Sequence, residues 1–166
     1  MRPVPLLFLL PFLLSPLQAA PAERLVIGAE AGKGLVIVDP AADNKVLFHH
    51  PLGAVHGLFL LPNGNFLTQD GWPRVVEIDL DGKTVWEYDA KTENRRAEDG
   101  KVEIHSFERL ENGNTLIVES GAGRILEVTP AKSIVKELPL EVSAPNPHSD
   151  TRQVHRLANG HFLVAH

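Results

Sequence analysis

Short apolar stretches alternate with tight polar turns along most of the chain. In the first repeat the stretches are 57–61, 66–69, 74–80 and 84–88, and in the second 106–110, 115–119, 124–128 and 134–138. Asn-Gly or Asp-Gly between apolar stretches is a strong hairpin signal, because a type I′ turn needs positive φ at both central positions. The pattern predicts antiparallel hairpins on type I′ turns, and no useful length of chain has the 3.6-residue period of a helix.

One segment occurs three times, beginning at His56, His105 and Arg152. Each copy carries an Asn-Gly pair, and successive pairs lie 49 and then 47 residues apart. The pairs, which we interpret as structural turns, are Asn63-Gly64, Asn112-Gly113 and Asn159-Gly160. A fixed period of this size indicates a repeat architecture, and four antiparallel strands per period describe a propeller blade. The prediction is an all-β fold, a β-propeller; a repeating two-sheet sandwich is the alternative.

The copies also define an organisation along the chain. We expect a partial blade at 23–52, complete blades at 53–101 and 102–150, and a truncated blade at 151–166. A closed propeller generally has four to eight blades. The chain is therefore expected to be incomplete, as the N-terminal fragment of a longer protein, with self-association as the alternative. Open blade edges could then pair with other chains.

The first 22 residues have the order of a secretory signal peptide. Arg2 precedes an apolar run at 4–14, and Ala20-Pro21-Ala22 supplies a small-x-small cleavage pattern. The run is too short and too proline-broken for a membrane helix, and the same prolines argue against a buried N-terminal helix. We expect cleavage near Glu23, no membrane span, and export to the periplasm or the extracellular space.

Composition excludes several classes of function. Without Arg2, 15 basic side chains face 21 acidic ones and form no basic cluster, so we expect no nucleic-acid partner. The chain contains no cysteine, which excludes a catalytic thiol. Gly-rich phosphate loops, His-Glu-x-x-His and Gly-x-Ser-x-Gly are also missing from the sequence.

Strand direction places the long connections opposite the tight turns, and long polar loops on a rigid scaffold commonly carry binding residues. We expect a small-molecule or protein ligand on this long-loop face. The candidates at the channel mouth are His56, His105, Arg152, Asp70, Glu119, Arg74 and Arg124. The first three begin the innermost strands and are expected to converge. Histidine, carboxylate and arginine together suit an anionic or metal-bound small ligand.

A structural role for the same residues is the competing interpretation. Asp70 and Glu119 are placed to pair with Arg74 and Arg124. The charged segment 89–101 is most simply a solvated loop. The other histidines, which lack metal-ligand spacing, are His49, His50, His148, His155 and His161. We therefore predict no metal site, and only His148, beside Asp150 in a proline-rich loop, has a functional case of its own.

Two motifs carry a family resemblance over about residues 25–166. The segment Glu77-Ile-Asp-Leu-Asp-Gly-Lys-Thr-Val-Trp-Glu-Tyr88 resembles the repeats of PQQ-binding-like (quinoprotein-type) β-propellers. The segment His56-x4-Leu-Pro-Asn-Gly-Asn-x-Leu67 is similar to repeats of arylsulfotransferase-type propellers. The first resemblance implies PQQ with calcium and an aromatic stack, and the second implies a histidine that carries sulfate. The repeats depart from the pattern at Lys136, where Trp is expected, and at Arg152, where His is expected.

These observations favour an exported binding or scaffold propeller, because no nucleophile–base pair or cofactor motif is visible in the sequence. The alternative is an enzyme of quinoprotein oxidoreductase or arylsulfotransferase type. Its site would lie on the His56/His105 face of the ring.

Overall fold

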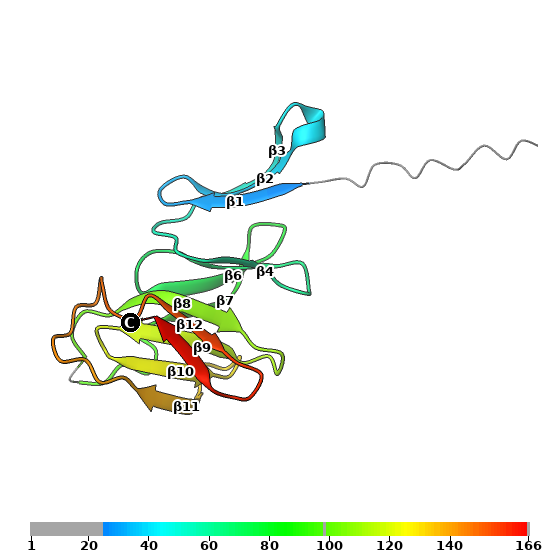
Figure 1. The fold of residues 1–166 in the computed structure, drawn as a ribbon. Coiled ribbons are helices and arrows are strands. Elements are labelled where there is room, and N and C mark those ends of the chain that lie inside the picture. Colours follow the sequence, from blue (N-terminus) through cyan, green and yellow to red (C-terminus); the bar gives the residue numbers. More distant parts are fainter. Residues whose placement is uncertain (1–24, 98, 166) are drawn as a thin grey trace, which may run out of the picture.

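The computed structural model describes residues 25–97 and 99–165, so the expected signal peptide lies outside the described residues. Antiparallel strands form four sheets in chain order (Figure 1). The first sheet comprises β1 (Val26–Glu30), β2 (Gly34–Asp39) and β3 (Lys45–His50). The second comprises β4 (Leu58–Leu60), β5 (Phe66–Gln69), β6 (Arg74–Ile78) and β7 (Thr84–Asp89). The third comprises β8 (Glu103–Arg109), β9 (Thr115–Ser120), β10 (Arg124–Val128) and β11 (Ile134–Pro139), and the last β12 (Gln153–Arg156) and β13 (Phe162–Ala165).

This architecture confirms the all-β prediction of four-stranded antiparallel sheets. Among the described residues, one short 3-10 helix (Pro40–Ala42) is present, and no helix there is long and apolar enough to cross a membrane. Strand β8 differs from expectation because it begins at Glu103 rather than at residue 106. The amide of Ile104 donates to the carbonyl of Trp72 in the preceding sheet, and Glu103 pairs with Ser120. These contacts extend β8 toward its N-terminus. The sequence did not indicate this extension, because the polar residues Glu103 and His105 interrupt the apolar pattern.

The hairpin positions are confirmed, but the predicted turn type is wrong. Gly64 has φ of 87°, whereas Asn63 is not in the positive-φ region. The Gly64 amide donates to Leu61 oxygen at 2.9 Å, and the Leu61 amide donates to Asn65 oxygen at 2.8 Å. This is a three-residue loop in which only the glycine is left-handed, the type I turn with a glycine bulge. The Asn63 side chain also accepts from the Asn65 amide at 3.0 Å, which closes the turn locally.

A buried carboxylate fixes each of the first two Asn-Gly hairpins to the following sheet. Glu77 Oε1 accepts from Asn63 Nδ2 at 3.0 Å and from Asn65 Nδ2 at 2.7 Å. Its Oε2 accepts from Arg109 Nη2, on β8 of the next sheet, at 2.7 Å. Glu127 repeats the arrangement with Asn112, Asn114 and Arg156 at 3.1, 2.8 and 3.2 Å. We call these two arrangements the glutamate clamps; they give the repeated Asn, Glu and Arg positions a structural role.

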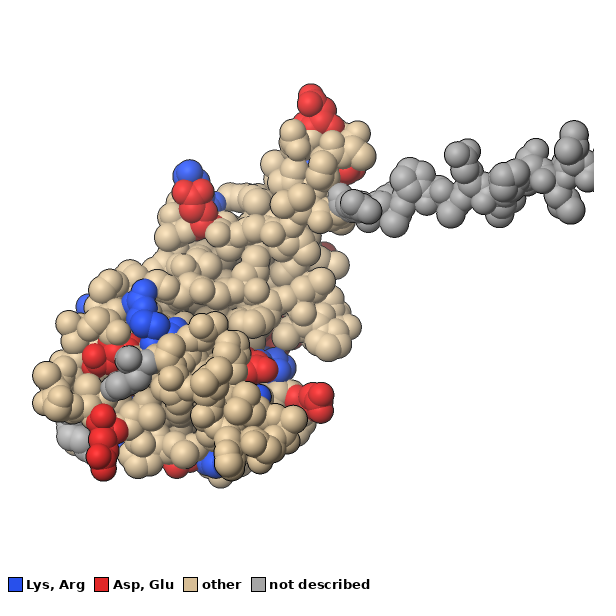
Figure 2. All heavy atoms as spheres, viewed as in Figure 1, with Lys and Arg blue, Asp and Glu red and all other residues tan. Residues whose placement is uncertain are grey.

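The core lies between the sheets rather than within them. On β5, Phe66 packs toward the first sheet, whereas its neighbour Leu67 packs toward the third. On β9, Ile117 joins the core shared with the second sheet, and Leu116 joins the core shared with β12 and β13. Successive side chains of a strand point to opposite faces, so β5 and β9 are buried along their whole length. Figure 2 shows that Lys, Arg, Asp and Glu side chains are scattered over this face of the molecule and do not gather into one patch.

Candidate functional site

The first strands of three successive sheets line a hollow of about 510 Å³. His56 lies just before β4, His105 lies within β8, and Arg152 lies just before β12. All three side chains belong to the lining, together with Phe59 and Phe107. These strands are the innermost ones of their sheets, so the hollow lies where the mouth of a central channel is expected.

The structure brings His56, His105 and Arg152 together. The ring centroids of His56 and His105 are 5.0 Å apart in an edge-on arrangement, and Arg152 Nη1 lies 3.4 Å from His105 Nδ1. Trp72, from the loop between β5 and β6, lies 5.0 Å from the His56 ring and 5.8 Å from the His105 ring. The mouth therefore combines imidazoles, a guanidinium and one large aromatic face.

A β-bulge places His105. Ile104 pairs with Glu119 and Ser106 pairs with Val118, so His105 is the extra residue on β8. A bulge bends its strand and redirects the bulged side chain, and bulges are frequent beside functional sites. His56 occupies the same repeat position but lies outside a strand and is exposed, whereas His105 is 5% exposed. Equivalent positions in the sequence thus have unequal surroundings.

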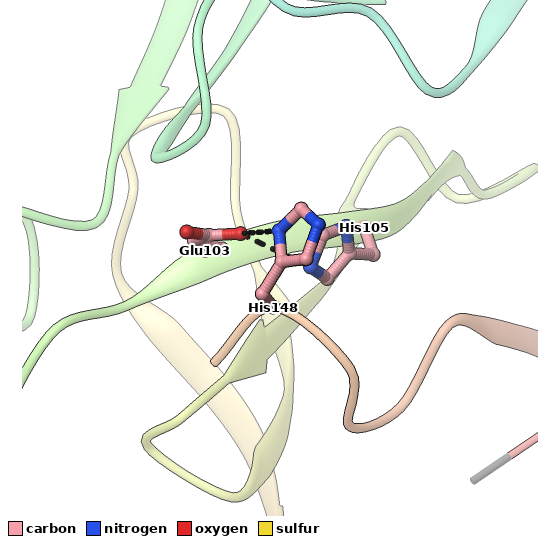
Figure 3. Close-up of side chains that lie close together, drawn as sticks. All are labelled: Glu103, His105 and His148. Atoms are coloured by element: carbon pink, nitrogen blue, oxygen red, sulfur yellow. Dashed lines mark hydrogen bonds and ion pairs between the residues drawn. The ribbon is translucent and has the colours of Figure 1, made fainter. Parts of the chain in front are cut away.

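The connection between β11 and β12 folds over this bulge. His148 Nδ1 lies 3.0 Å from Glu103 Oε2, and His105 Nε2 lies 3.0 Å from the carbonyl oxygen of Pro147. Arg152 Nη1 donates to the His148 carbonyl at 2.5 Å. Figure 3 shows Glu103 and His105 on the same strand, with His148 reaching toward them from the connection. We call Glu103, His105, His148, His56, Trp72 and Arg152 the mouth cluster.

Burial and neighbouring charges set the protonation of the cluster. Burial lowers the pKa of His105, and burial together with the Arg152 cation lowers the pKa of His56. Burial opposes ionisation of Glu103, but hydrogen bonds from Lys101 and His148 outweigh it and lower the pKa of that carboxyl. At neutral pH, His56 and His105 therefore present neutral imidazoles, and Glu103 presents an ionised carboxylate; these are the forms that accept protons or bind cations.

The other four candidates pair with one another and do not line the hollow. Asp70 forms an ion pair with Arg74, and its Oδ1 accepts from the Gly53 amide at 2.8 Å. Glu119 and Arg124 form a second pair, with Oε2 and Nε 2.6 Å apart. This agrees with the pairing that the competing interpretation expects for them.

The segment 89–101 is not simply a solvated loop, so that prediction is wrong. Its Asp99 side chain is 2% exposed and lies 3.4 Å from the Arg124 guanidinium. Tyr88, at the preceding strand end, donates its hydroxyl to Glu119 at 2.7 Å. Burial raises the pKa of Glu119 and, with the Glu119 charge, that of Tyr88. Charged side chains of this segment and of its neighbours thus form ion pairs and hydrogen bonds between the second and third sheets.

The sequence analysis missed two members of the mouth cluster, Glu103 and Trp72, and singled out a third, His148, only for its place beside Asp150. Glu103 and His148 are 45 residues apart, so no local ligand spacing reveals them. Trp72 stands in a short loop without an equivalent in the next repeat, where residue 122 is alanine. The pair His148 and Asp150 was a visible signal, but Asp150 accepts from the amide of Asn146 and caps the connection instead.

The cluster does not fit the calcium-bound PQQ that the first resemblance implies. Calcium takes six to eight oxygen ligands. The clustered side chains offer one carboxylate and several imidazole nitrogens, and Glu103 is already bonded to Lys101 at 2.6 Å and to His148. Trp72 supplies an aromatic face, but it packs edge-on against His105 and His148.

The fold is shared with known β-propellers. A protein of unknown function from Bacteroides caccae is similar, with a TM-score of 0.65, 21% identity, and coverage of 84% of this chain and 49% of that one. The WD40 β-propeller domain of Doa1 has a TM-score of 0.63, 15% identity, and coverage of 86% and 44%. Virginiamycin B lyase from Staphylococcus aureus has a TM-score of 0.56, 16% identity, and coverage of 88% and 46%.

The chain thus spans about half the length of these solved structures. No protein-family model and no curated protein matches it. Similarity at this level of identity concerns the fold alone, and the neighbours include a lyase as well as a protein without a known function. The described residues belong to an open, incomplete β-propeller.

Proposed function

We propose that this chain is part of an exported β-propeller that binds a small anionic ligand in the hollow beside His56, His105 and Arg152. The observation that carries the proposal is the convergence of these three side chains from three successive sheets around about 510 Å³ of space. An arginine beside aromatic and imidazole rings recognises a compact oxyanion through charge-assisted hydrogen bonds.

Arg152 is the residue whose removal tests this proposal. Titration calorimetry of the chain with inorganic sulfate should give binding that weakens at least tenfold in Arg152→Gln, because the guanidinium supplies the cation. Lys33→Gln is the matched control: it removes one positive charge from a side chain that is 74% exposed and pairs with Glu30. Equal sulfate affinity in the native chain and in Arg152→Gln would refute the proposal.

Export is the second part of the proposal, and it rests on the signal-peptide pattern of residues 1–22. Expression in a bacterial host with separation of periplasm and cytoplasm should yield a mature protein in the periplasm. Mass spectrometry should place its N-terminus near Glu23. A full-length chain that starts at Met1 and stays in the cytoplasm would contradict export.

A sulfuryl-transferring enzyme is the second candidate function, and one observation favours it. His56 is exposed at the rim of the hollow, and partial desolvation of its ring together with the Arg152 cation lowers its pKa, which keeps the imidazole in the neutral, nucleophilic form. An aryl sulfate would then lose its sulfuryl group to an imidazole nitrogen as the S–O bond breaks and the phenolate leaves. Phenol release that is lost in His56→Ala but kept in His49→Ala would support this candidate.

A further inference from the structure

Three side chains of the mouth cluster converge on one point, and of these only His105 also lines the hollow of the proposed anion site. Glu103, His105 and His148 each offer one ligand atom, and these atoms all lie within 4.8 Å of one another. Glu103 and His105 are fixed on β8, and His148 approaches from the connection before β12 (Figure 3). We propose that these three side chains bind a first-row divalent transition metal ion of the Zn²⁺ type.

The spacing of the donor atoms suits such an ion. Glu103 Oε2 lies 3.0 Å from His148 Nδ1 and 3.4 Å from His105 Nε2. A tetrahedral zinc site with ligands at 2.0–2.1 Å has edges of about 3.3 Å between neighbouring donors. An ion therefore needs only small side-chain adjustments at two of the three edges.

The chemistry of the donors selects the class of metal. Two imidazoles and one carboxylate suit zinc and similar first-row ions, whereas Mg²⁺ and Ca²⁺ require oxygen ligands. A site with three protein ligands keeps a fourth position for water or another ligand. Here the His148 side chain is 62% exposed, while the side chains of Glu103 and His105 are each 1% exposed, so solvent reaches the site on the side of His148.

Neighbouring residues hold the carboxylate in position. Lys101 Nζ bonds Glu103 Oε1 at 2.6 Å, which leaves Oε2 to face the two histidines. Such outer partners orient metal ligands and contribute to affinity. The bulge at His105 supplies the other fixed ligand.

Arg152 opposes the metal. In the tautomer that accepts from Arg152 Nη1 on Nδ1, His105 carries its proton on Nε2, which lies 3.0 Å from the Pro147 carbonyl oxygen. Metal binding at Nε2 moves that proton to Nδ1, so two donors then face each other and the guanidinium must turn away. The Arg152 contact with Nδ1 is long, at 3.4 Å, whereas its bond to the His148 carbonyl is 2.5 Å. The same cation that attracts an anion therefore weakens metal binding.

Titration calorimetry of the chain with Zn²⁺ tests the site directly. We expect one ion per chain, no comparable binding of Mg²⁺, and at least a tenfold weaker affinity in His148→Gln. His148 is the variant of choice because its side chain is exposed, whereas those of Glu103 and His105 are buried. His161→Gln is the matched control, since His161 is exposed in the β12–β13 turn. Unchanged Zn²⁺ affinity in His148→Gln, or an equal loss in His161→Gln, would overturn the proposal.

Arg152→Gln separates this inference from the proposed function, on which it does not depend. The variant should bind Zn²⁺ at least as tightly as the native chain while it loses sulfate. Sulfate binding that persists in Arg152→Gln would refute the anion site and leave the metal site standing. Zn²⁺ binding that is weaker in Arg152→Gln would contradict the opposing role given to Arg152, and with it the ligand assignment of His105 Nε2.

Discussion

The sheets β4–β7 and β8–β11 carry the same charged pair in very different surroundings. In the first, Asp70 and Arg74 are 22% and 39% exposed; in the second, Glu119 and Arg124 are 1% and 2% exposed. The difference comes from the segment between the two sheets, whose Asp99 and Asn94 contact the Arg124 guanidinium. The sequence repeat therefore fixes the position of each charged side chain in its sheet. The neighbouring connection decides how deeply the ion pair is buried, and so how much its loss costs in stability.

Removing the arginine of each ion pair should give the largest difference in stability between the two sheets. Arg124→Ala leaves Glu119 as an uncompensated buried charge, which we expect to cost about 3–5 kcal/mol in the free energy of unfolding. Arg74→Ala at the exposed pair should cost about 0–1 kcal/mol. Urea-induced unfolding of the two variants measures both values.

A double variant checks the reason for that difference. Arg124→Met combined with Glu119→Gln removes both charges and keeps an amide that can accept from the Tyr88 hydroxyl. It should be more stable than Arg124→Ala alone, because no unpaired charge remains buried. Equal costs for Arg74→Ala and Arg124→Ala would mean that the connection does not produce the difference.

The two glycines after the second strands should give the next largest effect. Gly71 and Gly121 have φ of 84° and 86°, so alanine is strained at both. At Gly71 the added Cβ meets only Pro73 Cδ, at 4.0 Å, and we expect a cost of about 1–2 kcal/mol. At Gly121 it would overlap the Lys101 carbonyl oxygen and lie 2.7 Å from Pro147 Cβ, which adds about 1–3 kcal/mol.

Thermal unfolding of Gly71→Ala and Gly121→Ala measures this difference. Gly64→Ala is the control, because its added Cβ meets nothing within 4 Å and only the φ of 87° is strained. If Gly121→Ala is no more destabilising than Gly64→Ala, the connection before β12 does not pack on this turn as described.

The glutamate clamps should respond alike in both sheets. Glu77→Gln and Glu127→Gln each weaken charge-assisted hydrogen bonds to two asparagines and one arginine. We expect about 1–3 kcal/mol of destabilisation for each, with the two values close to each other. Chemical denaturation of both variants tests the equality, and a large inequality would show that the neighbouring sheet governs the clamps too.

Acid should produce the smallest effect, a gradual loss of stability. Hydrogen bonds from Asn114 and Asn112 lower the pKa of Glu127 from its ordinary value of 4.5. A carboxyl whose pKa is lower in the folded state stabilises the fold above its unfolded pKa, and this contribution is lost as pH falls through the folded pKa. Glu127→Gln should therefore flatten the decline in unfolding free energy below pH 4.5, as followed by urea titrations at several pH values.

The repeat made the fold predictable, and parts of the site followed from it. Turn residues such as Asn63-Gly64 predicted the hairpins, and the shared repeat position predicted that His56 and His105 lie close together. The turn type was missed because a three-residue loop and a type I′ turn use the same Asn-Gly pair. Local sequence cannot distinguish them; the bulge and its strand register do.

The rest of the mouth cluster depends on long-range contacts. Glu103 meets His148 only because the connection between β11 and β12 returns to β8, a packing that no spacing in the sequence encodes. The burial of Asp99 was missed for a related reason: a run of charged residues reads as solvated until its partners on the next sheet are known. Polar residues that act between repeats are thus the least predictable part of this molecule.

The glutamate clamps have a consequence for how such a chain can change its length. The second repeat supplies both an arginine donor and a glutamate acceptor to the clamps. Its Arg109 donates to Glu77 in the preceding sheet, and its Glu127 accepts from Arg156 in the following sheet. A tandem duplication of that unit would supply each new neighbour with a matching donor and acceptor. At the clamp positions, the number of blades can therefore grow or shrink by whole copies without a compensating substitution.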